Sequence, residues 1–125
     1  MITGRAAVAF LALVLGIAGM AGAASAHHGW RWAKAGNFEI TGVVQSSKLG
    51  YPHGEVTMLV KGERWTVEVG QPWRNQRAGL KKAMLAKGTR ITVIGHRAKD
   101  ESQRLVKAER VRIDGKTYVL YPDRD

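Results

Sequence analysis

The stretch from Arg64 to His96, RWTVEVGQPWRNQRAGLKKAMLAKGTRITVIGH, changes its periodicity twice, and this change decides the fold. It begins with alternating apolar and polar residues, the period-two pattern of a half-buried strand. Gly70-Gln71-Pro72 ends this strand, and the proline suits the first turn of a helix because its missing N–H is not needed there. Residues 73–86 are predicted to form one broken helix or two short ones, interrupted near Gly79. The strand pattern then returns at 89–96.

Further strands are predicted on both sides of this stretch. The full set of predicted strands is 38–45, 55–60, 64–69, 89–96, 104–113 and 116–121. The segment 46–54 is expected to be a loop because Gly50, Pro52 and Gly54 interrupt the pattern. Asp114-Gly115 is a strong signal for a type I′ hairpin turn.

Three strands, a helical segment and two or three further strands follow one another, which is the order of an OB-fold. We therefore predict a mainly β protein, a small OB-fold-like barrel of five to six strands with a short helical segment between strands three and four. A small α+β sandwich is the competing architecture. The barrel domain is assigned to 38–121, after an extended arm at 27–37 and before a tail at 122–125. The side chains expected to pack in or on this barrel are Trp65, Val67, Val69, Trp73, Leu80, Ile91 and Val93.

Residues 1–26 have the composition of a cleavable signal peptide. Arg5 supplies a positive charge, 6–21 is almost entirely apolar, and Ala24-Ser25-Ala26 fits the small-x-small cleavage pattern. The apolar run is short for a membrane-spanning helix, which needs about 20 apolar residues. An uncleaved N-terminal anchor is the alternative. We expect a periplasmic or secreted protein whose mature chain begins at His27.

Composition narrows the classes of function. The chain has no cysteine, which excludes disulfides, cysteine nucleophiles and thiolate metal sites. It has 20 Lys and Arg against 10 Asp and Glu, a net charge of +10, and removal of the predicted leader would leave +9. Outside the cytoplasm such a charge suits lipid headgroups, acidic polysaccharide or an acidic protein rather than nucleic acid. A solvated basic surface without a ligand is the alternative. No phosphate loop, dinucleotide fingerprint or nucleophile elbow is present, so the sequence does not favour an enzyme.

All four histidines occupy positions at which they are candidates for metal ligands. His27 and His28 begin the predicted mature chain, where a free amine and a ring nitrogen can chelate one ion. His53 lies in the predicted 46–54 loop and His96 ends a strand, and the loops after strands one and four flank the usual OB binding face. Nitrogen ligands in a plane favour Cu(II), similar in ligand type to the histidine brace of copper monooxygenases and copper carriers, and a tetrahedral set favours zinc. Glu55 is a candidate to orient a ligand. A solvated terminus and loop histidines bonded to backbone are the alternatives.

A second candidate site is basic. Arg74, Arg77 and Lys81 follow helical spacing, with Lys82 and Trp73 beside them, and could bind phosphate or carboxylate groups. A solvated helix face is the alternative.

The chain resembles an uncharacterised family of small exported bacterial proteins with an Ala-His-His mature start, a Pro-His element and a Gly-His element. The likeness is carried by His27-His28-Gly29-Trp30, Tyr51-Pro52-His53-Gly54-Glu55-Val56, Trp65-Thr66-Val67-Glu68-Val69-Gly70 and Lys87-Gly88-Thr89-Arg90-Ile91-Thr92-Val93-Ile94-Gly95-His96. The resemblance implies an exported OB-like barrel and no established activity. Tyr51 departs from it, because a small polar residue is expected there.

Together these features favour an exported barrel that binds a transition metal, copper above all, as a carrier or buffer. The alternatives are an envelope module for an anionic ligand and a structural accessory with no small ligand.

Overall fold

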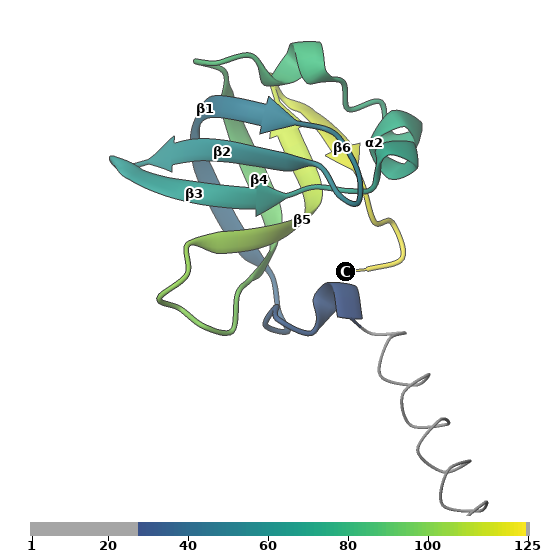
Figure 1. Cartoon of the computed structure of the whole chain (residues 1–125). Helices are drawn as coiled ribbons and strands as arrows, with labels where there is room; N and C mark the ends of the chain where they lie inside the picture. The colour runs from purple at the N-terminus through teal and green to yellow at the C-terminus, as the bar shows by residue number, and fades with distance from the viewer. Residues whose placement is uncertain (1–27, 125) are drawn as a thin grey trace, which may run out of the picture. The chain divides into compact units, whose positions relative to one another are not determined.

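The structure is a computed structural model that describes residues 28–124 (Figure 1). Its strands are β1 (Phe38–Lys48), β2 (Glu55–Val60), β3 (Glu63–Glu68), β4 (Arg90–Arg97), β5 (Leu105–Ile113) and β6 (Lys116–Val119). Its helical elements are η1 (His28–Trp30), α2 (Pro72–Ala78) and η2 (Lys82–Leu85). Internal contacts divide the chain into two units, Met1–Arg31 and Trp32–Asp125, and all six strands belong to the second. None of the helices within 28–124 has the length and apolar character needed to span a bilayer. The predicted leader at 1–26 lies outside the described residues.

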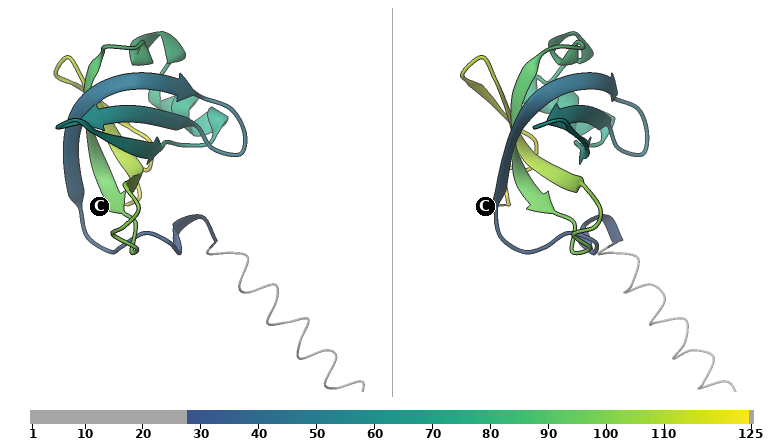
Figure 2. Two further views of the ribbon diagram at one scale, coloured as in Figure 1. Left: turned by 60° about the vertical axis from the view of Figure 1, so that its left-hand side comes forward. Right: turned by 90° about the vertical axis from the view of Figure 1, so that its left-hand side faces the viewer.

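Five strands close a barrel in the order β1-β2-β3-β5-β4, and β6 extends β5 outside it. β3 and β5 pair in parallel, and the other neighbouring strands pair antiparallel. β1 joins the two halves of the barrel, because 38–43 pairs with β4 and 43–48 pairs with β2 (Figure 2). With α2 and η2 between β3 and β4, this is the predicted OB-like order. The fold class is therefore confirmed, and the α+β sandwich is not the fold.

The long β1 strand bends where the sequence places a small residue. A Cβ atom on Gly42 would lie 2.4 Å from the backbone oxygen of Leu59, so only glycine fits between the two strands. A bulge follows between Val44 and Ser46, after which β1 continues to Lys48. The predicted loop began at residue 46, three residues too early. The residues 46–48 are polar and give no apolar alternation, but they pair with β2 across the bulge.

The predicted inward face is mostly correct. The side chains confirmed as buried core are Trp65, Val67, Val69, Leu80, Ile91 and Val93. Trp73 is the exception, since it is 50% exposed on α2. The helical segment breaks at Gly79, as predicted, where a left-handed residue with φ 83° caps α2. Asp114 and Gly115 have φ 51° and 76°, the positive values that a type I′ turn requires.

Candidate functional site

Two charged residues of β5 are buried as deeply as the core. Lys107 and Glu109 are each 1% exposed. Burying an ion costs several kcal/mol unless a partner compensates it, so each needs an explanation. The strand register supplies neighbours for Lys107, because it is paired with Glu68 on β3 and with His96 on β4. A row of ionisable side chains therefore crosses three strands of the barrel.

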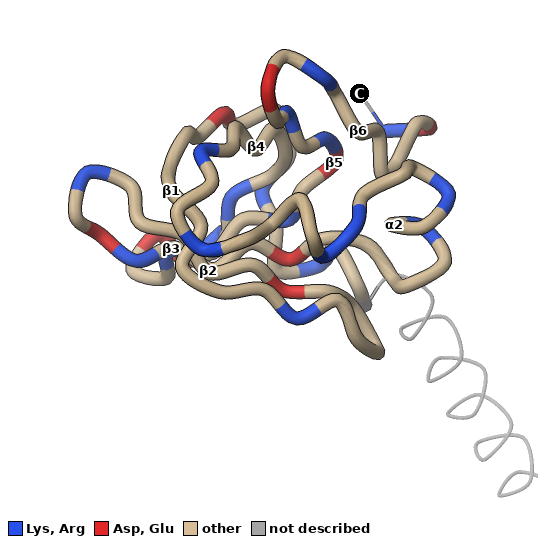
Figure 3. The backbone as a smooth tube through the Cα atoms, turned by 90° about the horizontal axis from the view of Figure 1, so that it is seen from above, with Lys and Arg blue, Asp and Glu red and all other residues tan. Residues whose placement is uncertain are grey.

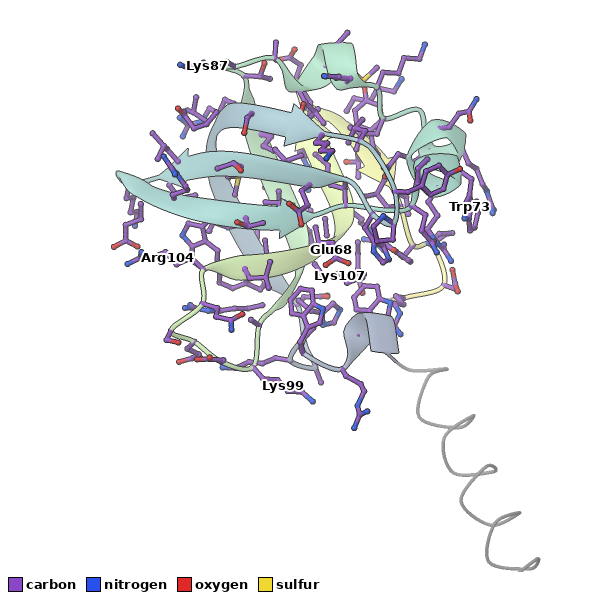
Figure 4. All side chains as sticks on the ribbon, in the orientation of Figure 1. Glu68, Trp73, Lys87, Lys99, Arg104 and Lys107 are labelled. Atoms are coloured by element: carbon purple, nitrogen blue, oxygen red, sulfur yellow. The ribbon has the colours of Figure 1, made fainter. Side chains whose placement is uncertain are left out.

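Glu68 lies between a buried ammonium and an imidazole. Its Oε1 accepts a hydrogen bond from Lys107 Nζ at 2.5 Å (Figure 4). The same oxygen lies 3.6 Å from His53 Nδ1. Lys107 Nζ also lies 5.8 Å from the centre of the Tyr121 ring. Burial raises the pKa of the Tyr121 phenol, the nearby charge of Arg74 opposes this shift, and Glu68 reinforces it. The cluster thus joins β3, β5, the β1–β2 loop and the C-terminal segment.

His53 is the accessible member of this cluster, with 28% of its side chain exposed. It lies in the loop 49–54, which is fixed to the start of the helical segment by a 2.9 Å hydrogen bond from Gly54 N–H to the Gly70 carbonyl. The Glu68 carboxylate lies 3.6 Å from Nδ1, just beyond hydrogen-bond distance. A small shift of the ring would let Nδ1–H donate to this carboxylate, and the lone pair would then lie on Nε2. This arrangement suits a metal ligand or a general base.

His96 occupies a different environment. Its Nδ1 lies 2.8 Å from the Lys34 carbonyl and its Nε2 lies 2.6 Å from Glu109 Oε1. Because a carbonyl can only accept, Nδ1 carries a proton, and a second proton lies between Nε2 and the carboxylate. Because Ile91 and Val93 face inward, the period of two in this strand places His96 on the opposite face and predicts that it is exposed. The exposure is wrong, because the ring is bonded to the Lys34 carbonyl and to the buried Glu109 carboxylate, and only 12% of its side chain is exposed.

The other proposed ligands fall at the edge of the described chain. His27 lies outside it, and of His28 only the backbone is described, as the first residue of η1. Within 28–124 no group of three or more His, Asp or Glu side chains is placed to hold a metal ion. The carboxylate beside His53 is Glu68, not Glu55, which is exposed.

Arg74 of the predicted basic stripe is held in a stack of aromatic rings. Its guanidinium carbon lies 4.2 Å from the centre of the Tyr121 ring and 4.6 Å from that of Trp73. The guanidinium also donates to Gln71 Oε1 at 3.2 Å and to the Leu120 carbonyl at 3.4 Å. These contacts fix its position between α2 and the segment that follows β6.

The structure brings together half of the predicted basic stripe. Arg74 and Arg77 both line a pocket of about 210 Å³, together with Trp73 and residues after β6. Lys81 and Lys82 do not line it. Lysines and arginines also occur on the strands and on the β2–β3 hairpin (Figure 3), so basic charge alone does not define a site.

A family model described as "Family of unknown function (DUF6152)" matches residues 14–107, about three quarters of the chain. The chain belongs to this family. The match agrees with the resemblance to an uncharacterised family and ends at Lys107, so the DUF6152 region includes His53, Glu68 and His96 but not Glu109. No curated protein sequence matches the chain.

This DUF6152 protein is similar to solved structures at low sequence identity. The ZRD-deleted mutant of TiaS in complex with agmatine is 14% identical with a TM-score of 0.52, over 71% of this chain and 27% of that one. The Stn1–Ten1 complex of S. pombe is 14% identical with a TM-score of 0.48, over 62% of this chain and 57% of that one. The chain thus spans about a quarter of the TiaS chain, and the TiaS likeness shows the barrel fold alone.

Proposed function

We propose that this protein is an exported carrier or buffer for a transition metal, and that His53 is the ligand supplied by the barrel. The observation that carries the proposal is the order Lys107, Glu68, His53, from a buried ammonium through a carboxylate to an accessible imidazole. Metal-binding histidines usually face a carboxylate or carbonyl with their second ring nitrogen, which fixes the tautomer and the ring orientation. For His53, the Glu68 carboxylate lies 3.6 Å from this second nitrogen.

The metal is proposed from the type of donor. Imidazole nitrogen suits copper, zinc, iron and nickel, and a nitrogen-rich set in a plane favours Cu(II), with zinc as the alternative. The sequence contributes His27 and His28 if export cleaves the chain after Ala26, because the new amine and the first ring can chelate one ion. Glu68 takes the orienting role that was first assigned to Glu55.

His96 is not part of the proposed ligand set. A metal on its Nδ1 would displace the hydrogen bond to Lys34, and a metal on its Nε2 would leave the carboxylate of Glu109 buried without this partner. We propose instead that His96 stabilises the segment before β1. This leaves His53 as the proposed ligand on the barrel, and His27 and His28 as a separately proposed chelate at the terminus that export would create.

The test is a Cu(II) titration of untagged protein beginning at His27, with electron paramagnetic resonance as the readout. We expect His53→Ala to reduce the number of coordinated nitrogens and to weaken binding. Glu68→Gln should weaken binding by about tenfold, the lower end for loss of a partner that orients a ligand. Glu55→Gln is the matched control, because it removes the same charge from the strand position paired with Glu68.

Each arm of this experiment has an outcome that contradicts the proposal. A spectrum and affinity unchanged in His53→Ala would exclude the barrel ligand. An equal loss of metal affinity in Glu55→Gln and Glu68→Gln would show that the lost negative charge matters and the position of Glu68 beside His53 does not. A version with one extra N-terminal Gly tests the terminal chelate separately, because the added residue moves the amine away from the His27 ring. Circular dichroism checks that each variant is folded.

A further inference from the structure

Two of the three exposed large apolar side chains of the described chain share one pocket, and the third lies on a loop that is attached to the chain just before α2. They are Tyr51, Trp73 and Val119, with 84%, 50% and 38% of their surface exposed. Trp73 and Val119 line the same pocket. Tyr51 lies in the loop 49–54, which is hydrogen-bonded to the chain just before α2 and turns beside that helix (Figure 1). Single exposed apolar residues are common on soluble proteins, but here Trp73 and Val119 line one pocket and Tyr51 lies on the neighbouring loop.

Basic side chains lie within the same patch. Arg74 and Arg77 line the pocket with Trp73, and the charge of Arg124 acts on Tyr121 under Arg74. No acidic residue of the described chain lines this pocket. Asp123 is close in sequence but is not among the lining residues. The patch therefore combines positive charge with exposed aromatic and aliphatic groups.

The stack around Arg74 explains why Trp73 stays outside the core. The guanidinium lies against both the Trp73 and Tyr121 rings and is hydrogen-bonded to Gln71 and to the Leu120 carbonyl. This holds the indole at the surface of α2 (Figure 4). An ordered, half-exposed Trp beside arginines is the arrangement that favours the headgroup region of a bilayer, where an amphipathic ring is both buried and wet.

We propose that the α2 patch, made of Tyr51, Trp73, Val119, Arg74 and Arg77, docks the protein on an anionic phospholipid surface. The net charge of +10 favours approach to such a surface, and the patch fixes which face of the protein meets it. A soluble anion would use the arginines but would leave Tyr51 and Val119 without a role. This inference is independent of metal binding, since none of these residues belongs to the proposed ligand set.

The first test is co-sedimentation with vesicles of phosphatidylglycerol and phosphatidylcholine, beside vesicles of phosphatidylcholine alone, in metal-free buffer. We expect binding to the anionic vesicles only, and loss of binding at high salt. Arg77→Gln should weaken binding by about fivefold, the effect of one basic residue near an anionic surface. Arg64→Gln is the matched control, because this exposed arginine lies on β3 near the β2–β3 turn, away from α2 (Figure 1).

The second test asks whether aromatic side chains enter the headgroup region. Lipids brominated on their acyl chains should quench tryptophan emission in the wild type, and Trp73→Phe should remove most of this quenching while keeping a ring beside Arg74. Tyr51→Ser should weaken binding without changing the fold. Equal binding to neutral and anionic vesicles, or equal losses in Arg64→Gln and Arg77→Gln, would overturn the proposal. So would saturation of the patch by inorganic phosphate without any vesicle binding, which would assign it to a soluble anion.

Discussion

Glu109 is the residue whose burial most needs a partner. Only 2% of its side chain is exposed, and its Oε1 lies 2.6 Å from His96 Nε2. The opposite nitrogen of His96 is bound to the Lys34 carbonyl, so the imidazole connects a buried carboxylate to the segment before β1. Because the carbonyl fixes a proton on Nδ1, the His96–Glu109 contact must share the remaining proton. The pair is neutral as a whole whichever atom holds it.

This geometry predicts that replacing His96 and replacing Glu109 lower the stability of the protein by different amounts. His96→Leu leaves a buried carboxylate without this partner and should lower the free energy of unfolding by about 3–5 kcal/mol. Glu109→Gln should cost less than about 1 kcal/mol, because a glutamine N–H can donate to the lone pair on Nε2 and keep both bonds. Urea unfolding followed by tryptophan fluorescence measures both values. Equal losses in the two variants would contradict the shared-proton description.

At this scale the sequence predicts some residues of the site and not others. Glycines and a proline correctly placed His53 in a loop. Strand parity wrongly predicted an exposed His96, because the partners that cover its ring come from other segments. The roles of Glu68 and Lys107 depend on the parallel register of β3 and β5, which are separated by the helical segment and by β4. Nothing in either strand alone encodes that register. The sequence alone therefore predicts that Lys107 is an exposed strand residue, and only the register shows that it is buried beside Glu68.

Among the strand pairs, β4 and β5 have a backbone approach so close that it restricts which residue fits at position 95. Its register shifts between Ile94 and Gly95, and the backbone of β5 approaches Gly95 closely. A Cβ atom built there would lie 1.9 Å from the backbone oxygen of Lys107, which no side chain can tolerate without a shift of the strand. The bulge thus sets the position of the residue that carries the buried ammonium.

Gly95→Ala should therefore destabilise the protein by about 3 kcal/mol, the upper part of the range for overpacking. Gly50→Ala is the control, because its nearest neighbour would be Lys48 Cε at 3.8 Å, and it should change stability by less than about 0.5 kcal/mol. Thermal unfolding compares the two variants with the wild type. A stable Gly95→Ala protein would mean that β5 moves away more easily than the close approach indicates.

Element boundaries show where sequence patterns stop being informative. β2 was predicted with its observed bounds because Gly54 precedes it and the Lys61-Gly62 turn follows it. The end of β1 was missed because Ser46, Ser47 and Lys48 hold their place by backbone pairing rather than by an apolar face. Trp73 was expected to pack in or on the barrel. Its exposure follows from the stack with Arg74, a contact between α2 and the C-terminal segment.

At the scale of the whole molecule, the C-terminal segment joins elements that are distant in the sequence. The backbone N–H groups of Leu120 and Tyr121 both donate to the Glu109 carbonyl, at 2.8 and 3.3 Å. The Tyr121 ring lies between Lys107 of β5 and Arg74 of α2. The barrel, the helix and the C-terminal segment therefore meet at the Tyr121 side chain.

The raised pKa of the Tyr121 phenol predicts how the stability of the protein changes at alkaline pH. Burial raises the pKa of its phenol above the ordinary value of 10.0, so the folded protein keeps the proton when the unfolded chain has lost it. Stability is then fully present below pH 10 and falls as the pH rises through the folded pKa. Tyr121→Phe should make this decline shallower, and Tyr51→Phe should not, because that ring is 84% exposed. Urea unfolding at several pH values between 8 and 11 gives the three slopes. Parallel slopes in the wild type and Tyr121→Phe would contradict the prediction. They would show that the phenol loses its proton as easily in the folded chain as in the unfolded one.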